Sequence, residues 1–391
     1  MIIKNDNGNE IKVFAKTVDD VTINQIKTLG NFDAYKDSKI RIMPDCHAGA
    51  GCVIGTTIKI KDKITPNLVG VDIGCGMLTI KLVETEIDLE NLDYIINNFI
   101  PNGFNIHDKQ KADFDFDRLI AKNLNIDRAK LSIGSLGGGN HFIEVAKNYL
   151  NELFLVIHSG SRNIGGMVAK RYQDIAIESL TDNSEEINTL VSKLKSEGRH
   201  REIGDEIKKI KKIIINKDLA YLTGDNFNDY MHDMNIMQEY ASLNRRTIAN
   251  IILSKANLTE NMSFETVHNY IDFHSMVLRK GAVSAANGEL LLIPINMRDG
   301  SILAVGKGND DWNCSAPHGA GRLMGRRQAH KDLDLSVFKH QMRDVYSTSV
   351  MSETLDEAPD AYKSIEEIID MIGDTVSIVD ILKPIYNFKS H

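Results

Sequence analysis

The chain has 391 residues, of which 42% are hydrophobic and 26% are charged, and its formal net charge is −8. This length is enough to bury a sizeable core as one large domain or as two ordinary ones, and the net negative charge argues against a protein that coats nucleic acid nonspecifically. The N-terminus is polar and no apolar run is long enough to cross a bilayer, so we expect a cytoplasmic protein that makes no membrane contact.

Alternating apolar and polar residues predict short strands in the first third of the chain, at residues 11–15, 52–59 and 77–83. A helix is expected over residues 89–99. The apolar run at residues 153–157 predicts a buried strand that delivers His158 into the turn SGSR, and a second helix is expected to begin near residue 163.

Residues 183–217 are rich in Glu, Lys, Asp and Ile, with helical spacing and little glycine. This pattern predicts a charged helical hairpin, which we interpret as an insertion over residues 181–218. A long helix is expected over residues 226–250, and a β-hairpin over residues 290–307 with Asp299-Gly300 at its turn.

The chain contains only seven prolines, no low-complexity tract and no clear internal repeat, so no linker is evident. Helices are expected to resume after Gly321. We therefore expect one interwoven catalytic domain over residues 1–391.

His318 is the most informative single residue, because it stands in the segment SAPHGAGR. The flanking glycines let backbone N–H groups approach an anion closely, and Arg322 offers a planar fork to phosphate oxygens. An imidazole in this setting is suited to attack on a phosphate, although glycine-flanked histidines also occur in ordinary turns.

The segment VGVDIGCGM places Asp72 and Cys75 three residues apart, with glycines on both sides of the thiol. A turn here can direct a carboxylate and a thiolate at one ion, and a thiolate can bridge two ions. One thiolate among oxygen and imidazole donors suits Mn²⁺, Zn²⁺ or Fe²⁺. The alternative is a buried structural cysteine. None of the four cysteines forms a CxxC pair, so we expect reduced thiols.

Three histidines favour the metal interpretation. His141 follows three consecutive glycines, which packing explains poorly, His158 ends an apolar strand, and His268 lies in the segment TVHNY. Each of them alone is compatible with an ordinary packing role. Together with Asp72 and Cys75 they predict a two-metal site.

Asp45 and His47 form a further polar cluster in the segment MPDCHAGAG. We expect these two residues to orient ligands or to bind substrate rather than to bind metal directly.

Several familiar nucleotide motifs are missing. The chain has no GxxxxGK[ST] segment, and its two GxGxxxG segments are one residue too long for a dinucleotide-binding fingerprint. An anionic substrate must therefore meet a local basic patch. The candidates for this patch are Arg162, Arg245, Arg246, Arg279, Lys280, Arg322, Arg326 and Arg327.

The chain resembles the RtcB-type RNA ligases over essentially its whole length. The matching motifs are MPDCHAGAG, VGVDIGCGM, LGGGNHFIE, HSGSR, YASLNRR, the pair His268-Asn269, HGAGR and a C-terminal lysine. The resemblance implies an α+β fold particular to that family, with mixed or antiparallel sheets flanked by helices. It also implies an enzyme of RNA repair or tRNA splicing that uses GTP and two Mn²⁺ ions. Its RNA partners would carry 2′,3′-cyclic phosphate or 3′-phosphate ends and 5′-hydroxyl ends, which it joins.

The resemblance further implies a role for each motif residue. His318 would attack the α-phosphorus of GTP to form a histidine-GMP intermediate, GMP would pass to the RNA 3′-phosphate, and the 5′-hydroxyl would then displace it. Cys75 would bridge the two manganese ions. The other protein ligands would be Asp72, His141, His158 and His268.

Further residues match nucleotide and RNA positions of the family. Glu144 would accept from guanine N–H donors and Tyr362 would stack on guanine, whereas Arg162 and Arg322 would lie against RNA or phosphate. The complete expected nucleotide pocket is Asn140, Glu144, Asn269, Ser301, Gly319, Ala320, Gly321, Tyr362 and Lys389.

The chain departs from the family pattern in places. Where the family usually has GSMG before a serine, this chain has INMRDGS, which keeps Ser301 but puts Asn296 in place of the first serine. The chain ends Lys389-Ser390-His391 and is short for the family. These features suggest a divergent branch, and the sequence identifies neither its natural RNA nor an activating protein partner.

Two alternatives remain open at this point. The first is a two-metal phosphoesterase in which His318 is a general acid and no covalent nucleotide forms. The second is a noncatalytic subunit that binds RNA ends and has kept the shape of the site.

Overall fold

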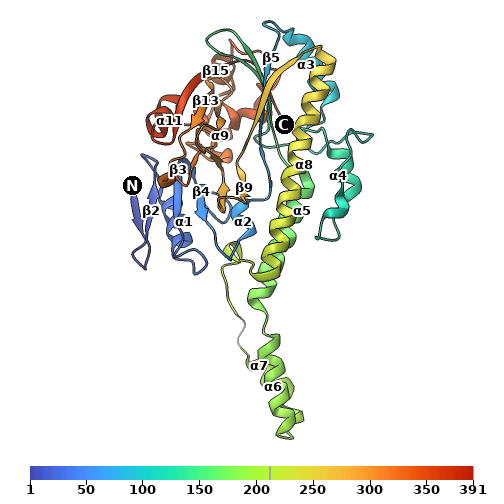
Figure 1. Ribbon diagram of the computed structural model, residues 1–391, viewed down its shortest axis with the longest axis vertical. Coiled ribbons are helices and arrows are strands. Elements are labelled where there is room, and N and C mark those ends of the chain that lie inside the picture. Colours follow the sequence, from blue (N-terminus) through green and yellow to red (C-terminus); the bar gives the residue numbers. More distant parts are fainter. Residues whose placement is uncertain (211–212, 391) are drawn as a thin grey trace.

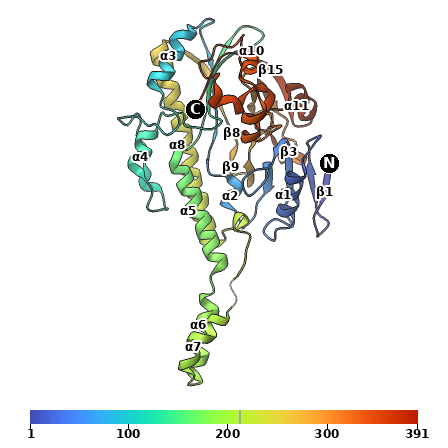
Figure 2. The same ribbon diagram turned by 180° about the vertical axis from the view of Figure 1, so that it is seen from behind.

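The computed structural model describes residues 1–210 and 213–390. Within them, two curled sheets are flanked by helices, and a pair of helices extends away from the body (Figures 1 and 2). The expected α+β class, with antiparallel sheets and flanking helices, is confirmed. No helix in the described part of the chain is long and apolar enough to cross a membrane.

The larger sheet has seven strands in the order β12-β13-β15-β6-β7-β5-β8, and every neighbouring pair is antiparallel. It curls so far that its two edge strands meet, and the backbone N–H of Leu292 donates to Oγ1 of Thr266 at 3.1 Å. The strands are β5 (Gly76–Leu82), β6 (Phe142–Lys147), β7 (Leu153–Ser159), β8 (Glu260–Val267), β12 (Leu290–Asn296), β13 (Gly300–Gly306) and β15 (Val376–Lys389).

The second sheet has six strands in the order β1-β2-β3-β4-β10-β9, and a separate two-stranded ladder pairs β11 with β14. Only β2 and β3 are parallel. The strands are β1 (Ile2–Lys4), β2 (Glu10–Val13), β3 (Ile40–His47), β4 (Ile54–Lys59), β9 (Asn269–Asp272), β10 (Val277–Lys280), β11 (Ala282–Ser284) and β14 (Ser315–Pro317).

Two long helices, α5 (Arg162–Thr181) and α8 (Gly224–Ala256), run side by side along one flank of the molecule (Figures 1 and 2). Ile248 and Ile252 of α8 pack against the larger sheet at Leu78 and Leu155. The burial of these aliphatic side chains removes apolar surface from water, so α8 acts as the back wall of that sheet.

Shorter helices complete the structure, and several begin at capping side chains. Asp19 accepts from the backbone N–H of Thr22 at the start of α1, and Asp88 accepts from that of Asn91 at the start of α3. These helices are α1 (Asp20–Gly30), α2 (Pro66–Val69), α3 (Leu89–Phe99), α4 (Ile126–Ser132), α9 (Arg326–Asp332), α10 (Leu335–Gln341) and α11 (Ile365–Ile372). The short 3-10 helices are η1 (Phe116–Arg118), η2 (His200–Glu202), η3 (Lys217–Leu219), η4 (Asp310–Trp312), η5 (Ser352–Glu357) and η6 (Pro359–Ala361).

The segment expected to be a charged hairpin contains α6 (Ser184–Ser196) and α7 (Ile203–Lys209), which contact each other and project from the end of α5 (Figure 1). Residues 211–212 of that segment lie outside the described residues, as does His391 at the chain end. The interpretation of residues 181–218 as an insertion stays a prediction.

The expected helix over 89–99 has those bounds, whereas the long helix is longer than expected and the strand predicted from residue 52 begins at Ile54. Cys52 is buried in the loop before that strand. The sequence pattern did not predict β15, the longest strand, because Pro384 interrupts the alternation of apolar and polar residues in it. The register of β15 shifts between Pro384 and Tyr386, a bulge that accommodates a residue without an N–H donor.

Candidate active site

The five candidate metal ligands lie at one end of the seven-stranded sheet. Cys75 directly precedes β5, His141 directly precedes β6, His158 is the penultimate residue of β7, and His268 directly follows β8. Asp72 lies in the turn before β5, where the N–H of Cys75 donates to its carbonyl oxygen at 3.2 Å. Antiparallel strands thus bring residues far apart in the sequence to one edge.

The strand register explains this convergence. Gly76 pairs with Val267, and Phe142 pairs with His158. The residues one position before Gly76 and Phe142 and one position after Val267 therefore meet His158. Glycine is needed at position 76 because a β-carbon there would lie 2.6 Å from the carbonyl oxygen of Thr266 on the neighbouring strand. The close approach of β5 and β8 therefore depends on a residue without a side chain.

Two groups of donor atoms share the thiol of Cys75. Its Sγ lies 3.4 Å from Nε2 of His141 and 3.3 Å from Nε2 of His158. The donor atoms of Asp72, Cys75 and His141 lie within 4.8 Å of one another, as do those of Cys75, His158 and His268. Two adjacent triads with one common sulfur could hold two metal ions, with Cys75 available to both.

Backbone carbonyl groups fix which nitrogen of two histidines faces the cluster. Nδ1 of His141 lies 2.9 Å from one carbonyl oxygen, and Nδ1 of His158 lies 3.2 Å from another. Because a carbonyl only accepts, each Nδ1 donates and each Nε2 presents a lone pair toward Cys75. Nε2 of His141 also lies 3.1 Å from Oδ2 of Asp72. Several electron-pair donors thus face one another, and a bound cation would satisfy them.

Burial sets the protonation of these groups. Burial and the positive charge of neighbouring rings lower the pKa values of His158 and His268 well below 6.5, so both rings are neutral at neutral pH. Burial alone would raise the pKa of Asp72, but without a metal a protonated His141, which then donates from Nε2, holds that pKa below its usual value. Burial raises the pKa of the Cys75 thiol well above 9.0, and a divalent cation lowers the pKa of a thiol that coordinates it.

Nδ1 of His268 is buried and has no hydrogen-bond partner among the described residues. Its ring centroid lies 5.1 Å from that of His158 and 5.0 Å from that of His318. An unpaired buried polar atom is energetically unfavourable, and coordination to a metal is one chemistry that satisfies it. The residues of this cluster therefore fit a pair of divalent cations.

His318 follows β14 and is oriented by a residue of the other sheet. Its Nδ1 lies 2.6 Å from Oδ2 of Asp45, and its backbone N–H donates to the same oxygen at 3.1 Å. Since a carboxylate offers only acceptors, Nδ1 donates and Nε2 keeps its lone pair. Gly321 has a φ of +76°, and a β-carbon there would lie 2.4 Å from the carbonyl oxygen of Asp45, so glycine allows the His318 loop to lie against β3.

His47 supports the same arrangement, because its Nδ1 lies 3.0 Å from the carbonyl oxygen of Asp45. Burial lowers the pKa of His47 below 6.5. The expectation that Asp45 and His47 orient other groups agrees with these contacts, and Asp45 orients the candidate nucleophile rather than a metal ligand.

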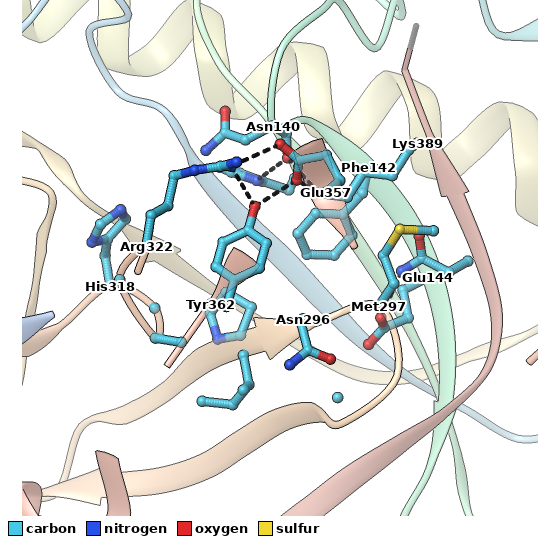
Figure 3. A pocket seen from close by; sticks show the side chains of 18 of the residues that line it. Asn140, Phe142, Glu144, Asn296, Met297, His318, Arg322, Glu357, Tyr362 and Lys389 are labelled. Atoms are coloured by element: carbon cyan, nitrogen blue, oxygen red, sulfur yellow. Dashed lines mark hydrogen bonds and ion pairs between the residues drawn. The ribbon is translucent and has the colours of Figure 1, made fainter. Parts of the chain in front are cut away.

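A cavity of about 290 Å³ opens beside His318 (Figure 3). Its wall includes the glycine-rich loop after His318, strands β6, β12 and β15, and the segment that carries Tyr362. All of the expected nucleotide-pocket residues except Asn269 and Ser301 line it, together with His47, His158 and Arg322.

One wall of the cavity carries two unpaired acceptor oxygens. Nδ2 of Asn387 donates to Oε2 of Glu144 at 2.8 Å across the β6–β15 pair. Oε1 of Glu144 and Oδ1 of Asn387 are buried and have no partner among the described residues. Burial raises the pKa of Glu144 to about 7, although the hydrogen bond from Asn387 and the charge of Lys389 oppose it. A ligand edge with N–H donors would satisfy both oxygens.

Glu357 organises a second part of the cavity wall. Its carboxylate accepts from Nζ of Lys389 and from the hydroxyl of Tyr362, each at 2.7 Å, and it lies 3.3 Å from Nη1 of Arg322 (Figure 3). Burial alone would raise the pKa of Glu357, but the charge and hydrogen bond of Lys389 lower it to about 2. This cluster keeps two cations beside the cavity in spite of their burial.

Two expected pocket residues lie elsewhere. Oδ1 of Asn269 accepts from the N–H of Gly281 at 3.0 Å, and its Nδ2 lies 3.3 Å from the carbonyl oxygen of Asp72, so it braces the candidate metal turn. Ser301 is buried in β13 away from the cavity lining. By contrast Asn296 does line the cavity, and its Nδ2 donates to Asp299 at 2.9 Å.

Arg162 begins α5 with a φ of +56° and lies on the metal side of the site rather than in the cavity lining. Its Nε lies 3.3 Å from Oγ of Ser135, and its Nη2 lies 3.4 Å from the carbonyl oxygen of Gly103. Burial lowers its pKa, while the charge of Asp72 raises it.

The expected basic patch is wrong for three of its members. Arg245 and Arg279 are almost completely buried, and Lys280 is nearly so. Arg245 forms a two-pronged ion pair with Glu265 at 3.1 Å, and Arg279 donates to Oγ of Ser315 at 2.9 Å. These side chains hold strands and loops in place instead of presenting charge to a substrate.

Sequence reasoning missed Glu357 and Asn387, along with Phe142 and Met297 in the cavity wall. Glu357 stands in the acidic segment SETLDEAPD, which resembles solvated surface. Asn387 is placed opposite Glu144 only by the strand register. The proximity of Glu357 to Tyr362 in the sequence was the one available signal.

The sequence is similar to a known protein family and to several of its members. The sequence model of the family described as "tRNA-splicing ligase RtcB" matches residues 25–126 and 111–390. An RNA-splicing ligase RtcB of Escherichia coli strain K12 is 31% identical, and the alignment covers 90% of each chain. A tRNA-splicing ligase RtcB of Archaeoglobus fulgidus is 23% identical over 85% of this chain and 83% of its own length. An RNA-splicing ligase RtcB homolog 2 of Entamoeba dispar is 22% identical over 89% and 80% of the two chains.

Proposed function

This chain belongs to the tRNA-splicing ligase RtcB family, and from that premise we propose that it is a GTP- and Mn²⁺-dependent RNA ligase. It joins RNA 3′-phosphate or 2′,3′-cyclic phosphate ends to 5′-hydroxyl ends. The observation that carries the proposal is the contact between His318 and buried Asp45, beside both a two-triad metal cluster and a cavity with paired acceptor oxygens.

His318 acts as the nucleophile. Because Asp45 accepts the proton on Nδ1, the lone pair on Nε2 remains available to attack the α-phosphorus of GTP. A nitrogen–phosphorus bond forms as the bond to pyrophosphate breaks. The buried Asp45 also stabilises the positive charge that the ring gains during the attack, in the way that a buried carboxylate supports a catalytic histidine elsewhere.

The cavity binds the guanine base. Glu144 and Asn387 present unpaired acceptor oxygens in its wall, which suit the N–H donors on the guanine edge. Tyr362 and Lys389 lie on the Glu357 side of the same cavity. The backbone of Gly319, Ala320 and Gly321 approaches the phosphate groups closely because two of these residues lack side chains.

Asp72, Cys75, His141, His158 and His268 would hold two manganese ions. When bound there, the ions supply positive charge that offsets the triphosphate and the departing pyrophosphate. Asn269 braces the turn that carries Asp72 and so keeps the candidate ligands in position.

The RNA ends complete the reaction. Water first opens a 2′,3′-cyclic phosphate to a 3′-phosphate. An oxygen of the RNA 3′-phosphate then attacks the phosphorus of the histidine-GMP intermediate, and the nitrogen–phosphorus bond breaks. The 5′-hydroxyl of the second strand then attacks the activated 3′-phosphate, and GMP leaves. Arg162 and Arg322 would contact phosphate, and Arg322 would share its guanidinium with Glu357 and Tyr362.

An end-joining assay tests this function. A 3′-phosphorylated RNA and a 5′-hydroxyl RNA, incubated with the protein, GTP and Mn²⁺, should yield a joined strand. His318→Ala should yield none, whereas His340→Ala, which changes an exposed histidine of α10, should behave as wild type. Release of phosphate from RNA ends without GTP and without joining would instead identify a phosphoesterase and contradict the proposal.

A further inference from the structure

Phe104 exposes 94% of its surface. No other aromatic residue in the described part of the chain is exposed to this extent; the next is Tyr149, at 76%. Single exposed apolar residues are common on proteins, so exposure alone carries no function. The position of Phe104 and the arginines beside its loop do point to a function.

The backbone around Phe104 is held firmly. The N–H of Gly103 lies 2.8 Å from the carbonyl oxygen of Gly137 and 3.2 Å from Oγ of Ser390. The carbonyl oxygen of Phe104 accepts from Nη2 of Arg128 at 2.6 Å. An aromatic ring on an anchored loop loses little conformational entropy when it binds a flat partner.

The same contacts place Phe104 at the rim of the active site. Gly137 begins the loop that leads to Asn140 in the cavity wall and to His141 in the metal cluster. The carbonyl oxygen of Gly103, next to Phe104, lies 3.4 Å from Nη2 of Arg162. The exposed ring is therefore one residue away from a backbone group that contacts the arginine proposed to meet the RNA 3′-phosphate.

Two arginines lie beside the Phe104 backbone, since Arg128 donates to the carbonyl oxygen of Phe104 and Arg162 donates to that of Gly103. Arg128 and Arg162 form no ion pair within 4.0 Å among residues 1–210 and 213–390, and the same holds for the exposed Lys109 and Lys111 later in the Phe104 loop. The charge of Arg128 acts on Arg162 directly and lowers its pKa, in addition to the larger effect of burial. A phosphate backbone would supply the ion-pair partner that Arg128 does not have among the described residues.

An exposed aromatic ring with an arginine beside it is a combination with which proteins hold single-stranded nucleic acid, because every base has a face that stacks and every linkage has a phosphate. We propose that Phe104 is the stacking platform for the terminal base of the RNA strand that carries the 3′-phosphate, with Arg128 holding the backbone. This inference rests on the proposed function and describes how the same site binds its RNA. Stacking does not read base identity, so the platform accepts any terminal base.

Binding measurements test the platform directly. The probe is a fluorescently labelled single-stranded RNA with a 3′-phosphate, titrated against wild type and Phe104→Ala without GTP. The substitution should weaken binding by roughly five- to a hundredfold, the range that loss of one base–aromatic stack produces. Phe104→Trp should restore binding. Tyr149→Ala, which removes an exposed ring from the turn at the far end of β6, is the matched control and should bind as wild type.

A second probe separates stacking from other roles. An RNA whose 3′-terminal nucleotide lacks its base should bind wild type as weakly as the intact RNA binds Phe104→Ala, and the two changes together should cost no more than either one. Equal binding of intact RNA by wild type and Phe104→Ala would overturn the proposal, as would additive losses. Equal binding would leave the ring as a contact for a protein or as plain surface, whereas additive losses would mean that Phe104 contacts the RNA elsewhere than at the terminal base.

Nucleotide transfer keeps this test distinct from the test of the proposed function. Phe104→Ala should form the histidine-GMP adduct as wild type does, because the adduct forms without RNA, and loss of the adduct would make Phe104 a structural residue and overturn the platform. If wild type itself forms no adduct, the proposed function fails, while the two RNA probes still decide whether Phe104 stacks on a base.

Discussion

At the centre of the site, a single sulfur atom lies within 3.4 Å of the Nε2 atoms of two histidines. Both of those nitrogens are directed inward by a carbonyl group on the far side of the ring. The thiol of Cys75 is thus the one donor common to both triads, and its removal should affect both ions at once.

Cys75→Ala should abolish the histidine-GMP adduct and reduce bound manganese, while the protein stays folded, since alanine fills part of a buried position without adding charge. Metal content by elemental analysis and folding by circular dichroism check the two halves of this expectation. Cys314→Ala, which changes a thiol outside both triads, is the control. An unchanged adduct in metal-defined buffer would remove Cys75 from the ligand set.

Glu144 gives a prediction about pH. Burial raises the pKa of its carboxyl to about 7, and only the ionised form leaves Oε1 free to accept from a guanine N–H while Oε2 accepts from Asn387. The affinity for guanosine should therefore rise as the pH increases from 6 to 8 and then level off, by roughly tenfold in all. Guanosine is the right probe because it carries no phosphate that titrates in this range.

Glu144→Gln keeps the size of the side chain and has no titratable proton, so its affinity should be low and should not vary with pH. Isothermal titration calorimetry at several pH values measures both proteins. A wild-type affinity that is flat across this range, or that falls as the pH increases, would contradict the assignment of Glu144 to the base.

Among the elements, α6 and α7 stand apart from the site. They contact each other and project from the body, whereas the candidate ligands lie at the end of the seven-stranded sheet (Figure 1). Their replacement by a short flexible linker should leave adduct formation unchanged and should shift the melting temperature by only a few degrees. Removal of α4 is the contrasting variant. Tyr240 of α8 donates to the carbonyl oxygen of Ala129 in α4, so removal of α4 should unfold the core.

If removal of α6 and α7 abolishes adduct formation, these helices support the site, and the interpretation of residues 181–218 as an insertion fails. If adduct formation is kept while RNA joining is lost, the helices serve the RNA instead. Parallel adduct and joining assays on the same preparation distinguish the two outcomes.

Local sequence signals predicted those elements and residues whose environment is set by their neighbours in the chain. Asp72, Cys75, His141 and His318 stand in glycine-bearing turns, and the helix at 89–99 has a clear amphipathic period and a capping aspartate. Asn387 and Glu357 could not be found in this way. Their roles depend on the pairing of β15 with β6 and on a buried cluster drawn from three separate segments.

The prediction of a basic patch was wrong at three residues for a similar reason. Arg245 belongs to the motif YASLNRR, which predicts a charged helix surface, yet it faces inward and pairs with Glu265 of β8. A charged residue in the sequence does not reveal whether an ion-pair partner lies opposite it in the core. Only the tertiary structure separates a buried pair from an exposed cation.

At the scale of the whole molecule, the nucleophile and the candidate metal ligands come from different sheets. His318 is positioned by Asp45 of the six-stranded sheet, whereas Cys75 and the ligand histidines belong to the seven-stranded sheet. The rings of His268 and His318, 5.0 Å apart, mark where the two halves meet. The reactive geometry therefore exists only when both sheets are folded and packed together.

The mass of the intact protein after incubation with GTP and Mn²⁺ tests the central claim most directly. The account predicts a gain equal to one GMP, lost upon removal of the metal by a chelator beforehand and absent from His318→Ala. A wild-type mass that does not change, or a GMP adduct that persists in His318→Ala, would contradict it.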